Sequence, residues 1–305
     1  MQSAEQGRGI RQKAQEVCPG QLCQNLRSQR ADGIIAAPRH DFCRSSPAGR
    51  GVAVDKEAQK GPGRELRVTH FNIASWRAWA PGLDADEDCQ AWLQAPWRLA
   101  DNGEQPDVSF LPAMQRRRLS RLARILFHVA WPIAEARGPL PLVFVSRHGE
   151  TPRTLNILAD LARNEPLSPT QFSLSVHNAI IGLWSILRAD SSEMSALAGE
   201  ADGLEQGLLE AASLLGDGAP AVLLVVAEET PPALYAPFID DVPLSYAVAL
   251  LLTPGNDWQL SLLPGSGPRA EWPHALELAR ALHSGQRTLQ HHCKNRHWSW
   301  SCNKA

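Results

Sequence analysis

The sequence lacks long hydrophobic runs and lacks an excess of charge of either sign. No apolar stretch reaches the roughly eighteen residues that a membrane-spanning helix needs, and no hydrophobic core of a secretion signal stands near the first residue. With 30 Lys and Arg against 32 Asp and Glu, the net charge of −2 gives no general attraction to nucleic acid or to an acidic membrane. We therefore expect a cytoplasmic protein without a membrane span and without a nucleic-acid partner.

Cysteine is sparse, and none occurs between Cys89 and Cys293. The spacing of the six cysteines matches no zinc ribbon. Histidine and cysteine do gather near the C-terminus, but their spacing is irregular and the segment resembles a tail, so we predict no metal site there. These C-terminal residues are His291, His292, Cys293, His297 and Cys302.

Residues 1–65 differ in composition from the rest of the chain. They carry eleven Lys and Arg against seven Asp and Glu, and they show no sustained apolar period. Such a segment cannot bury enough apolar surface to offset the entropy lost on ordering, so we expect it to be disordered. Because methionine occurs only at positions 1, 114 and 194, a mis-extended reading frame is the alternative explanation.

From Leu66 onward, apolar runs alternate with segments of helical period. This order indicates an α/β fold with a mixed, mostly parallel sheet that helices cover. The expected strands lie at 66–76, 141–149, 191–199 and 221–229, and the expected helices at 114–130, 154–164, 168–189, 200–218 and 274–283. We also expect an antiparallel hairpin of 244–255 with 257–264, and a tail after the last helix.

The run LVFVSRHGET at 142–151 raises one enzymatic hypothesis. It resembles the motif of histidine phosphatases and phosphoglycerate mutases, in which a strand delivers a nucleophilic histidine to a phosphate, and His148 would have that role. However, the strand at 221–229 ends in Glu228 and Glu229, which would repel a phosphate. No G-x-S-x-G motif of a serine hydrolase occurs either. A phosphatase-type hydrolase that acts through His148 stays as the alternative function.

The stretch SPTQFSLSVHNAIIGLWSI at 168–186 is more specific. Together with the strand at 66–76, the RRRLSRLA helix and VFVSRHGE, it resembles the N-terminal half of β-ketoacyl synthases, the condensing enzymes with a thiolase-like fold. More narrowly, the chain is similar to the stand-alone ketosynthase-like proteins of aryl polyene clusters. The resemblance implies a ketosynthase-like N-terminal domain at 66–265, followed by a helix and tail at 266–305.

The chemistry of that family needs a cysteine thiolate at the N-terminus of a buried helix, where the helix dipole and backbone amides stabilise charge. The resemblance puts the nucleophile position near Ala201, and no cysteine lies within about ninety residues of it. Glu200 and Asp202 would oppose a thiolate. The family's catalytic histidines come from a second half, and only about forty residues follow Pro264. The resemblance therefore implies a subunit without condensing activity of its own and without a cofactor.

Four residues of the expected 168–189 helix are candidate binding residues: Ser175, His177, Asn178 and Gly182. They would line or support an acyl tunnel at a subunit interface, with Gly182 permitting the close approach of another backbone. The alternative is that these polar groups are satisfied in an ordinary helix–helix contact. The sequence leaves both readings open.

The resemblance also implies partners. A protein like a chain length factor would pair with a catalytic ketosynthase in fatty-acid, polyketide or aryl polyene chain elongation. We expect the contact at 168–199, either with the ketosynthase or with a second copy of the chain. The basic face of the 114–130 helix could contact an acidic acyl carrier protein, or it could simply be solvated. Its arginines are Arg116, Arg117, Arg121 and Arg124.

Overall fold

This computed structural model describes residues 67–83, 86–96, 101 and 103–304. The expectations for residues 1–65 lie outside that part of the chain. Residues 158–166 belong to a separate compact unit, so they are described by themselves. Within them, the Arg163 side chain pairs with Asp160 at 2.6 Å and with Glu165 at 2.8 Å.

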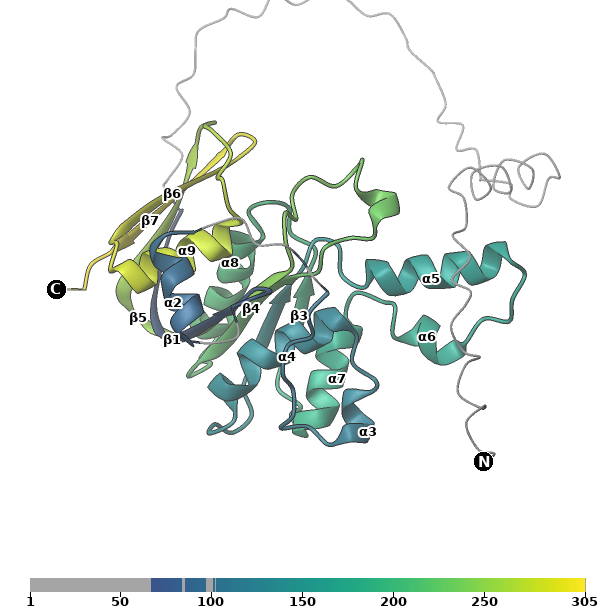
Figure 1. The fold of residues 1–305 in the computed structure, drawn as a ribbon. Helices are drawn as coiled ribbons and strands as arrows, with labels where there is room; N and C mark the ends of the chain where they lie inside the picture. The colour runs from purple at the N-terminus through teal and green to yellow at the C-terminus, as the bar shows by residue number, and fades with distance from the viewer. Residues whose placement is uncertain (1–66, 84–85, 97–100, 102, 305) are drawn as a thin grey trace, which may run out of the picture. The chain divides into compact units, whose positions relative to one another are not determined.

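The described residues form a seven-stranded mixed sheet with the order β3-β2-β4-β5-β7-β6, in which β1 pairs with β5 (Figure 1). Strands β2, β3 and β4 are mutually parallel, and the remaining pairs are antiparallel. The expected α/β class with a mixed sheet is confirmed, but only two of the six described strand pairs are parallel, so the sheet is not mostly parallel as expected. The strands are β1 (Arg67–Trp79), β2 (Leu142–Val145), β3 (Met194–Leu197), β4 (Val222–Glu228), β5 (Tyr246–Pro264), β6 (Thr288–Cys293) and β7 (Arg296–Cys302).

Helices cover both faces of this sheet. The helices are α2 (Asp86–Gln94), α3 (Ala113–Arg116), α4 (Arg121–Ala134), α5 (Thr151–Ala162), α6 (Pro169–Ser173), α7 (Ala179–Arg188), α8 (Gly203–Gly216) and α9 (His274–Ser284), with a short 3-10 turn at Ala233–Tyr235.

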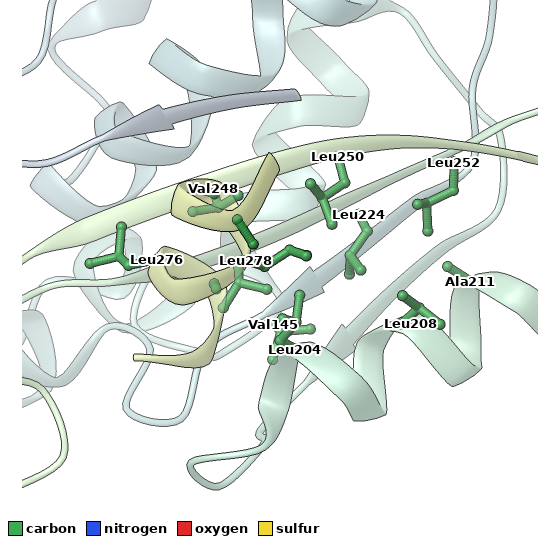
Figure 2. Close-up of a cluster of buried hydrophobic side chains, with 14 of the residues drawn as sticks. Val145, Leu204, Leu208, Ala211, Leu224, Val248, Leu250, Leu252, Leu276 and Leu278 are labelled. Carbon is green, nitrogen blue, oxygen red and sulfur yellow. The ribbon is translucent and has the colours of Figure 1, made fainter. Parts of the chain in front are cut away.

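The alternation of apolar residues along β4 divides the core between the two faces. Val222, Leu224 and Val226 face one cluster, which α2, α8 and α9 complete. Leu223 and Val225 face the other cluster, which α4 and α7 complete. Figure 2 shows the first cluster, where the leucines of α8 lie under the strands. Because β4 is buried on both faces, its sequence is a continuous apolar run.

Helix α8 packs unusually close to the sheet through glycines. A Cβ added to Gly207 would lie 2.5 Å from Val145 Cγ2 and 2.8 Å from Leu224 Cδ1, and one added to Gly203 would lie 2.9 Å from Val145 Cγ1. A Cβ on Gly199 would meet the Gly203 Cα at 2.4 Å. The spacing of four residues puts Gly203 and Gly207 on one helical row, so they set how closely the first turn of α8 approaches β2.

Strand β5 corrects the prediction of a hairpin. Its nineteen residues run as one strand through Pro254, Gly255 and Asn256, where the predicted hairpin of 244–255 with 257–264 would have turned. The register with β1 shifts there, from Asn72 opposite Thr253 to Phe71 opposite Trp258. The extra residues form a bulge, and the Asn72 side chain stabilises it by accepting a hydrogen bond from the Asp257 backbone N–H at 2.9 Å.

Two other predictions of secondary structure are wrong. The expected helix at 168–189 is two helices, α6 and α7, separated by residues 174–178. The break leaves the His177 ring free to cross to the loop after β2, where its Nε2–H donates to the Ser146 carbonyl at 2.7 Å. The expected tail is the antiparallel pair β6 and β7, in which Trp298 and Trp300 point into the core and alternate with polar residues.

Candidate functional site

A cavity of about 260 Å³ lies at the edge of the sheet where β2 and β4 end. Its wall includes Arg147, which follows β2, and Glu228, the last residue of β4. Ala201, just before α8, also lines it, so the residue that the resemblance put at the nucleophile position faces this space. Tyr246 at the start of β5 and His274 at the start of α9 also line it. The other polar or charged residues of the wall are Glu200, Asp240, Asp241, Arg269 and Glu271.

The carboxylates beside Ala201 are bound by the C-terminal strand pair. Asp202 is fully buried and accepts hydrogen bonds from Arg296 Nε at 2.6 Å and from Trp298 Nε1 at 2.9 Å. Glu200 pairs with Lys294 Nζ at 2.6 Å and with Arg296 Nη2 at 3.2 Å. Burial alone would raise the pKa of Asp202, but the bonds from Arg296 and Trp298 lower it below its usual value.

Glu205, in the first turn of α8, is the centre of a second buried cluster. It is fully buried and accepts from His274 Nδ1 at 3.0 Å, from His291 Nδ1 at 2.6 Å and from Trp300 Nε1 at 3.2 Å. Burial opposes the charge of Glu205, but the two histidines, His274 first, lower its pKa well below the usual range. Burial likewise lowers the pKa of His274, and Glu205 more than compensates, so that pKa is raised.

Glu205, His274 and His291 are also residue types that bind metals, and their ligand atoms lie within 4.8 Å of one another. Both Nδ1 atoms, however, already make hydrogen bonds to the carboxylate at 2.6 and 3.0 Å. The other nitrogen of His291, Nε2, is buried without a partner among the described residues, whereas metal-bound histidines usually donate that N–H to a neighbouring acceptor. The geometry fits an ion-paired hydrogen-bond cluster, and the expected absence of a metal site stays a prediction.

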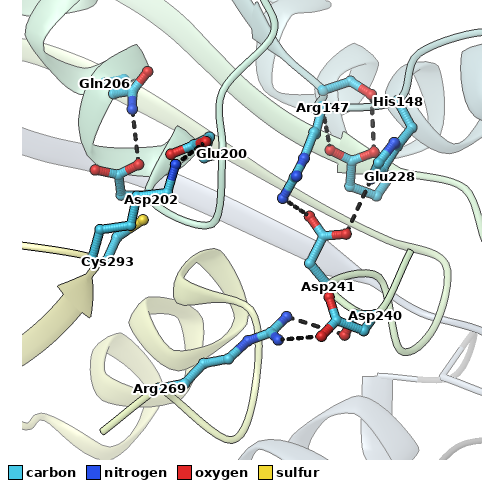
Figure 3. Close-up of polar contacts among 12 residues, drawn as sticks. Arg147, His148, Glu200, Asp202, Gln206, Glu228, Asp240, Asp241, Arg269 and Cys293 are labelled. Atoms are coloured by element: carbon cyan, nitrogen blue, oxygen red, sulfur yellow. Dashed lines mark hydrogen bonds and ion pairs between the residues drawn. The ribbon is translucent and has the colours of Figure 1, made fainter. Parts of the chain in front are cut away.

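The RHG motif lies on the same edge of the sheet and is held by acidic side chains (Figure 3). Asp241 accepts from Arg147 Nη1 at 2.5 Å and pairs with His148 Nε2 at 3.1 Å. Glu228 accepts from the Arg147 backbone N–H and from Ser146 Oγ. Burial raises the pKa of Glu228 to about 7. Carboxylates therefore occupy the surroundings that a phosphatase would fill with cations, so this geometry gives the phosphatase alternative no support.

The four candidate binding residues lie apart from the cavity, on α7 and the segment before it. The Ser175 hydroxyl donates to the Phe172 carbonyl at 2.8 Å, and His177 bonds to the loop after β2. Asn178 begins α7, with an exposed side chain that makes no capping bond. Gly182 is exposed, and a Cβ there would meet no atom within 4 Å. Any close approach at Gly182 must therefore come from outside the described chain.

Exposed apolar side chains occur on that helix and on the segment before it. Phe172 is 63% exposed, Val176 44% and Ile186 74%. We call these three residues with Gly182 the α6–α7 face. The adjacent strand β3 ends the sheet and pairs only with β2 among the described strands. Exposed apolar groups beside a free strand edge are typical of an interaction surface.

The basic face of the expected 114–130 helix is only partly present. The helix begins at Arg121, and the Arg121 guanidinium turns inward to Asp101, at 2.7 Å, and to Ser245 Oγ, at 2.7 Å. Arg124 donates to the Arg116 carbonyl at 2.8 Å. Arg117 is exposed, and no hydrogen bond or ion pair of its side chain occurs within the described part of the chain.

Comparison with known proteins identifies the family. The model of the β-ketoacyl synthase N-terminal domain matches residues 89–301, which is more than two thirds of the chain. The chain belongs to this family, as the resemblance predicted. The match extends through α9, β6 and β7, so the C-terminal strand pair that binds the first turn of α8 lies within the family domain.

Two solved structures show the same architecture. A chain from the ketosynthase ApeO in complex with its chain length factor ApeC, from Xenorhabdus doucetiae, is 30% identical with a TM-score of 0.69; the match covers 76% of this chain and 99% of that one. The ishigamide ketosynthase/chain length factor shares the fold, at 17% identity and a TM-score of 0.51, over 65% of this chain and 67% of that one. The search of curated proteins found no match.

In the part of the chain that the structure describes, no helix is both long and apolar enough to span a membrane.

Sequence reasoning named Ala201, which lines the cavity, but missed Tyr246 and His274 in the same wall and Glu205, which binds His274. The only local signal for His274 was its position at the start of an amphipathic helix, which does not identify its partner 69 residues away.

Proposed function

We propose that this protein is a non-catalytic, chain-length-factor-like subunit that pairs with a catalytic ketosynthase. One observation carries the proposal. Ala201, near which the resemblance puts the nucleophile position, lines a cavity, and the neighbouring Asp202 already accepts hydrogen bonds from Arg296 and Trp298. An alanine offers no atom that can attack an acyl group, and a buried carboxylate beside it disfavours a thiolate.

The similarity to a chain of the ketosynthase–chain length factor complex supports this role, because it covers nearly all of that chain. By this analogy the subunit would shape the space in which a growing acyl, polyketide or aryl polyene chain is held, while the partner supplies the thiolate. We further propose an acyl carrier protein as a transient partner, for which the exposed Arg117 supplies one contact of suitable charge. The cytoplasmic location expected from the sequence stays a prediction.

We infer that the ketosynthase binds at β3 and the α6–α7 face. The backbone carbonyls of Glu193 and Leu197 accept bonds from β2, at 3.0 Å each. Because backbone groups alternate along a strand, the N–H groups of Met194 and Ala196 point to the free edge. Another strand could pair there and extend the sheet, and the apolar side chains of the α6–α7 face would be buried beside it.

The test is co-expression with a candidate ketosynthase, followed by size-exclusion chromatography with light scattering. Met194→Pro removes an N–H on the outer edge, so we expect loss of the complex while the monomer stays folded. The matched control is Ser195→Pro, which removes an N–H on the β2 side and should instead destabilise the monomer. A complex undisturbed by Met194→Pro would contradict the proposed interface, and a homodimer of the isolated chain would identify a second copy as the occupant.

A second measurement tests the lack of catalysis. The purified chain should form no acyl-enzyme and should not decarboxylate a malonyl carrier protein, as followed by intact-protein mass spectrometry. Formation of a covalent acyl adduct by the isolated chain would overturn the non-catalytic role, whatever the outcome of the pairing experiment.

A further inference from the structure

The loop between β4 and β5 forms one wall of the cavity beside Ala201. We call residues 230–245 of this loop the strap. The two ends of the strap are joined at its base, where Ser245 Oγ accepts a hydrogen bond from the Thr230 backbone N–H at 2.9 Å. A loop whose ends meet in this way can move as a unit about its base. The strap residues that line the cavity are Asp240, Asp241, Val242 and Pro243.

Backbone hydrogen bonds do not tie the strap to the rest of the domain. Within the described residues, every backbone–backbone hydrogen bond of residues 231–244 lies inside the strap, such as that from the Phe238 N–H to the Tyr235 carbonyl at 2.8 Å. Val242 and Leu244 are buried near its base, but Phe238 is 83% exposed, and the 3-10 turn stands clear of the sheet (Figure 1). A segment with so few buried contacts opens at a low cost in free energy.

Ion pairs hold the strap from two sides (Figure 3). Asp241 accepts from Arg147 Nη1 at 2.5 Å and pairs with His148 Nε2 at 3.1 Å, and both partners lie in the turn after β2. The adjacent Asp240 pairs with Arg269 Nη1 at 3.2 Å, on the segment that precedes α9. Neighbouring residues of the strap thus bind two different parts of the cavity wall.

The two attachments differ in strength. The Asp240 side chain is 89% exposed, and an exposed ion pair contributes little because water and salt screen it. The Asp241 side chain is 9% exposed and has two partners, and charged hydrogen bonds with so little access to water are costly to break. Glu228 fixes the turn from its other side by accepting a hydrogen bond from the Arg147 backbone N–H. Asp241 is therefore the attachment that holds the strap.

We propose that the strap is a lid on this cavity, held shut by the ion pairs of Asp241 with Arg147 and His148, and that release of Asp241 opens the cavity. The proposal accounts for the two arginines of a wall that carries more acidic than basic side chains, because Arg147 and Arg269 are both committed to the strap. It concerns access to the cavity, and it does not rest on the proposed function.

The experiment measures how fast iodoacetamide alkylates a reporter thiol that Ala201→Cys places in the cavity of the full chain. Peptide mass spectrometry assigns the modified site, and Cys302, which is outside the cavity wall, is the internal reference. In this background Asp241→Ala should accelerate alkylation at position 201 about tenfold or more, since it removes both bonds to the turn. An unchanged rate relative to Cys302 would overturn the proposal.

The matched control is Asp240→Ala, which removes the same charged group from the next residue. Loss of either carboxylate favours ionisation of the reporter thiol, so only the difference between the two variants measures opening. Because the Asp240 pair is exposed, we expect Asp240→Ala to change the rate by less than about twofold. Equal acceleration by both variants would mean that local charge sets the rate, and it would overturn the proposal.

A charge swap tests the pair itself. Arg147→Glu sets two carboxylates against each other and should open the strap, although the added negative charge disfavours a nearby thiolate. The double variant Arg147→Glu with Asp241→Arg restores opposite charges and should return the alkylation rate toward that of Ala201→Cys alone. No recovery in the double variant would contradict the role of this pair.

Hydrogen–deuterium exchange shows whether the strap moves alone. Asp241→Ala should accelerate exchange of the amides of residues 231–244 about tenfold and leave those of β4 and α8 unchanged. Equal acceleration in β4 and α8 would mean that the variant destabilises the whole domain, and it would overturn a lid that opens by itself.

Discussion

The first turn of α8 and the outer face of α7 differ in their surroundings. The charged side chains of the first have partners within the chain, whereas the second is exposed. In α8, the buried carboxylates Asp202 and Glu205 receive all their partners from the same chain, mostly from β6 and β7. In α7, Gly182 and Ile186 face open space. The first region is therefore held by contacts within the chain, whereas the second leaves apolar surface exposed in the described part of the chain.

The largest expected effect comes from breaking the closed region with Glu205→Gln. This variant leaves His274 and His291 without a carboxylate, and removal of one partner of a buried ion pair costs about 3–5 kcal/mol. We expect that loss in the free energy of urea unfolding at pH 6.

The pH dependence sharpens this prediction. The pKa of Glu205 is lowered from 4.5, so its contribution is present above pH 4.5 and lost as pH falls through the folded value. The pKa of His274 is raised from 6.5, so its contribution is complete below pH 6.5 and lost as pH rises through the folded value. Glu205→Gln should therefore destabilise the protein less at pH 8.5 than at pH 6. An equal loss of stability at both pH values would mean that the effect comes from packing alone.

A smaller effect is expected from Gly207→Ala on the inner side of α8. The added methyl group would lie 2.5 Å from Val145 and 2.8 Å from Leu224, so the helix must move away from the sheet. Overpacking of this kind costs about 1–3 kcal/mol, which thermal and urea unfolding would detect. Unchanged stability would mean that α8 does not depend on its glycines for the close approach.

The smallest effect, and of opposite sign, is expected from Gly182→Ala on α7. Its Cβ meets no atom within 4 Å, and alanine is favoured over glycine inside a helix by about 0.5–1 kcal/mol, so the monomer should become more stable. If the α6–α7 face is the interface, the same change should weaken the complex with a ketosynthase. A variant that stabilises the monomer without affecting the complex would remove Gly182 from the contact.

Local patterns predicted the parallel strands well, because β2 and β4 are continuous apolar runs that only a buried strand explains. They failed where a distant residue decides the structure. The interruption between 244–255 and 257–264 suggested the turn of a hairpin, but Asn72, far away in the sequence, stabilises a bulge at that point. The alternation of Trp298 and Trp300 was a strand signal that was overlooked because the segment is polar between them.

The candidate site was predictable only in part, for the same reason. The position of Ala201 followed from a family motif, which is local in sequence. The partners of the adjacent carboxylates lie 69 to 96 residues later, and neither periodicity nor composition relates Glu205 to His274, or Asp202 to Arg296. The four candidate binding residues do not line the cavity, so their role in binding stays a prediction.

The long strand β5 sets an order for folding during synthesis. β1 pairs along nearly all of β5, with Arg67 opposite Leu262, so the first described strand can join the sheet only after almost two hundred further residues have been made. Asp202 and Glu205 wait longer for their partners, since Arg296 and Trp300 are made 94 and 95 residues after them. Contacts so distant in sequence form slowly, and until then the edge of β4 and two buried charges lack their partners. The most charged part of the interior of a nascent chain is therefore neutralised only after β7 has been made.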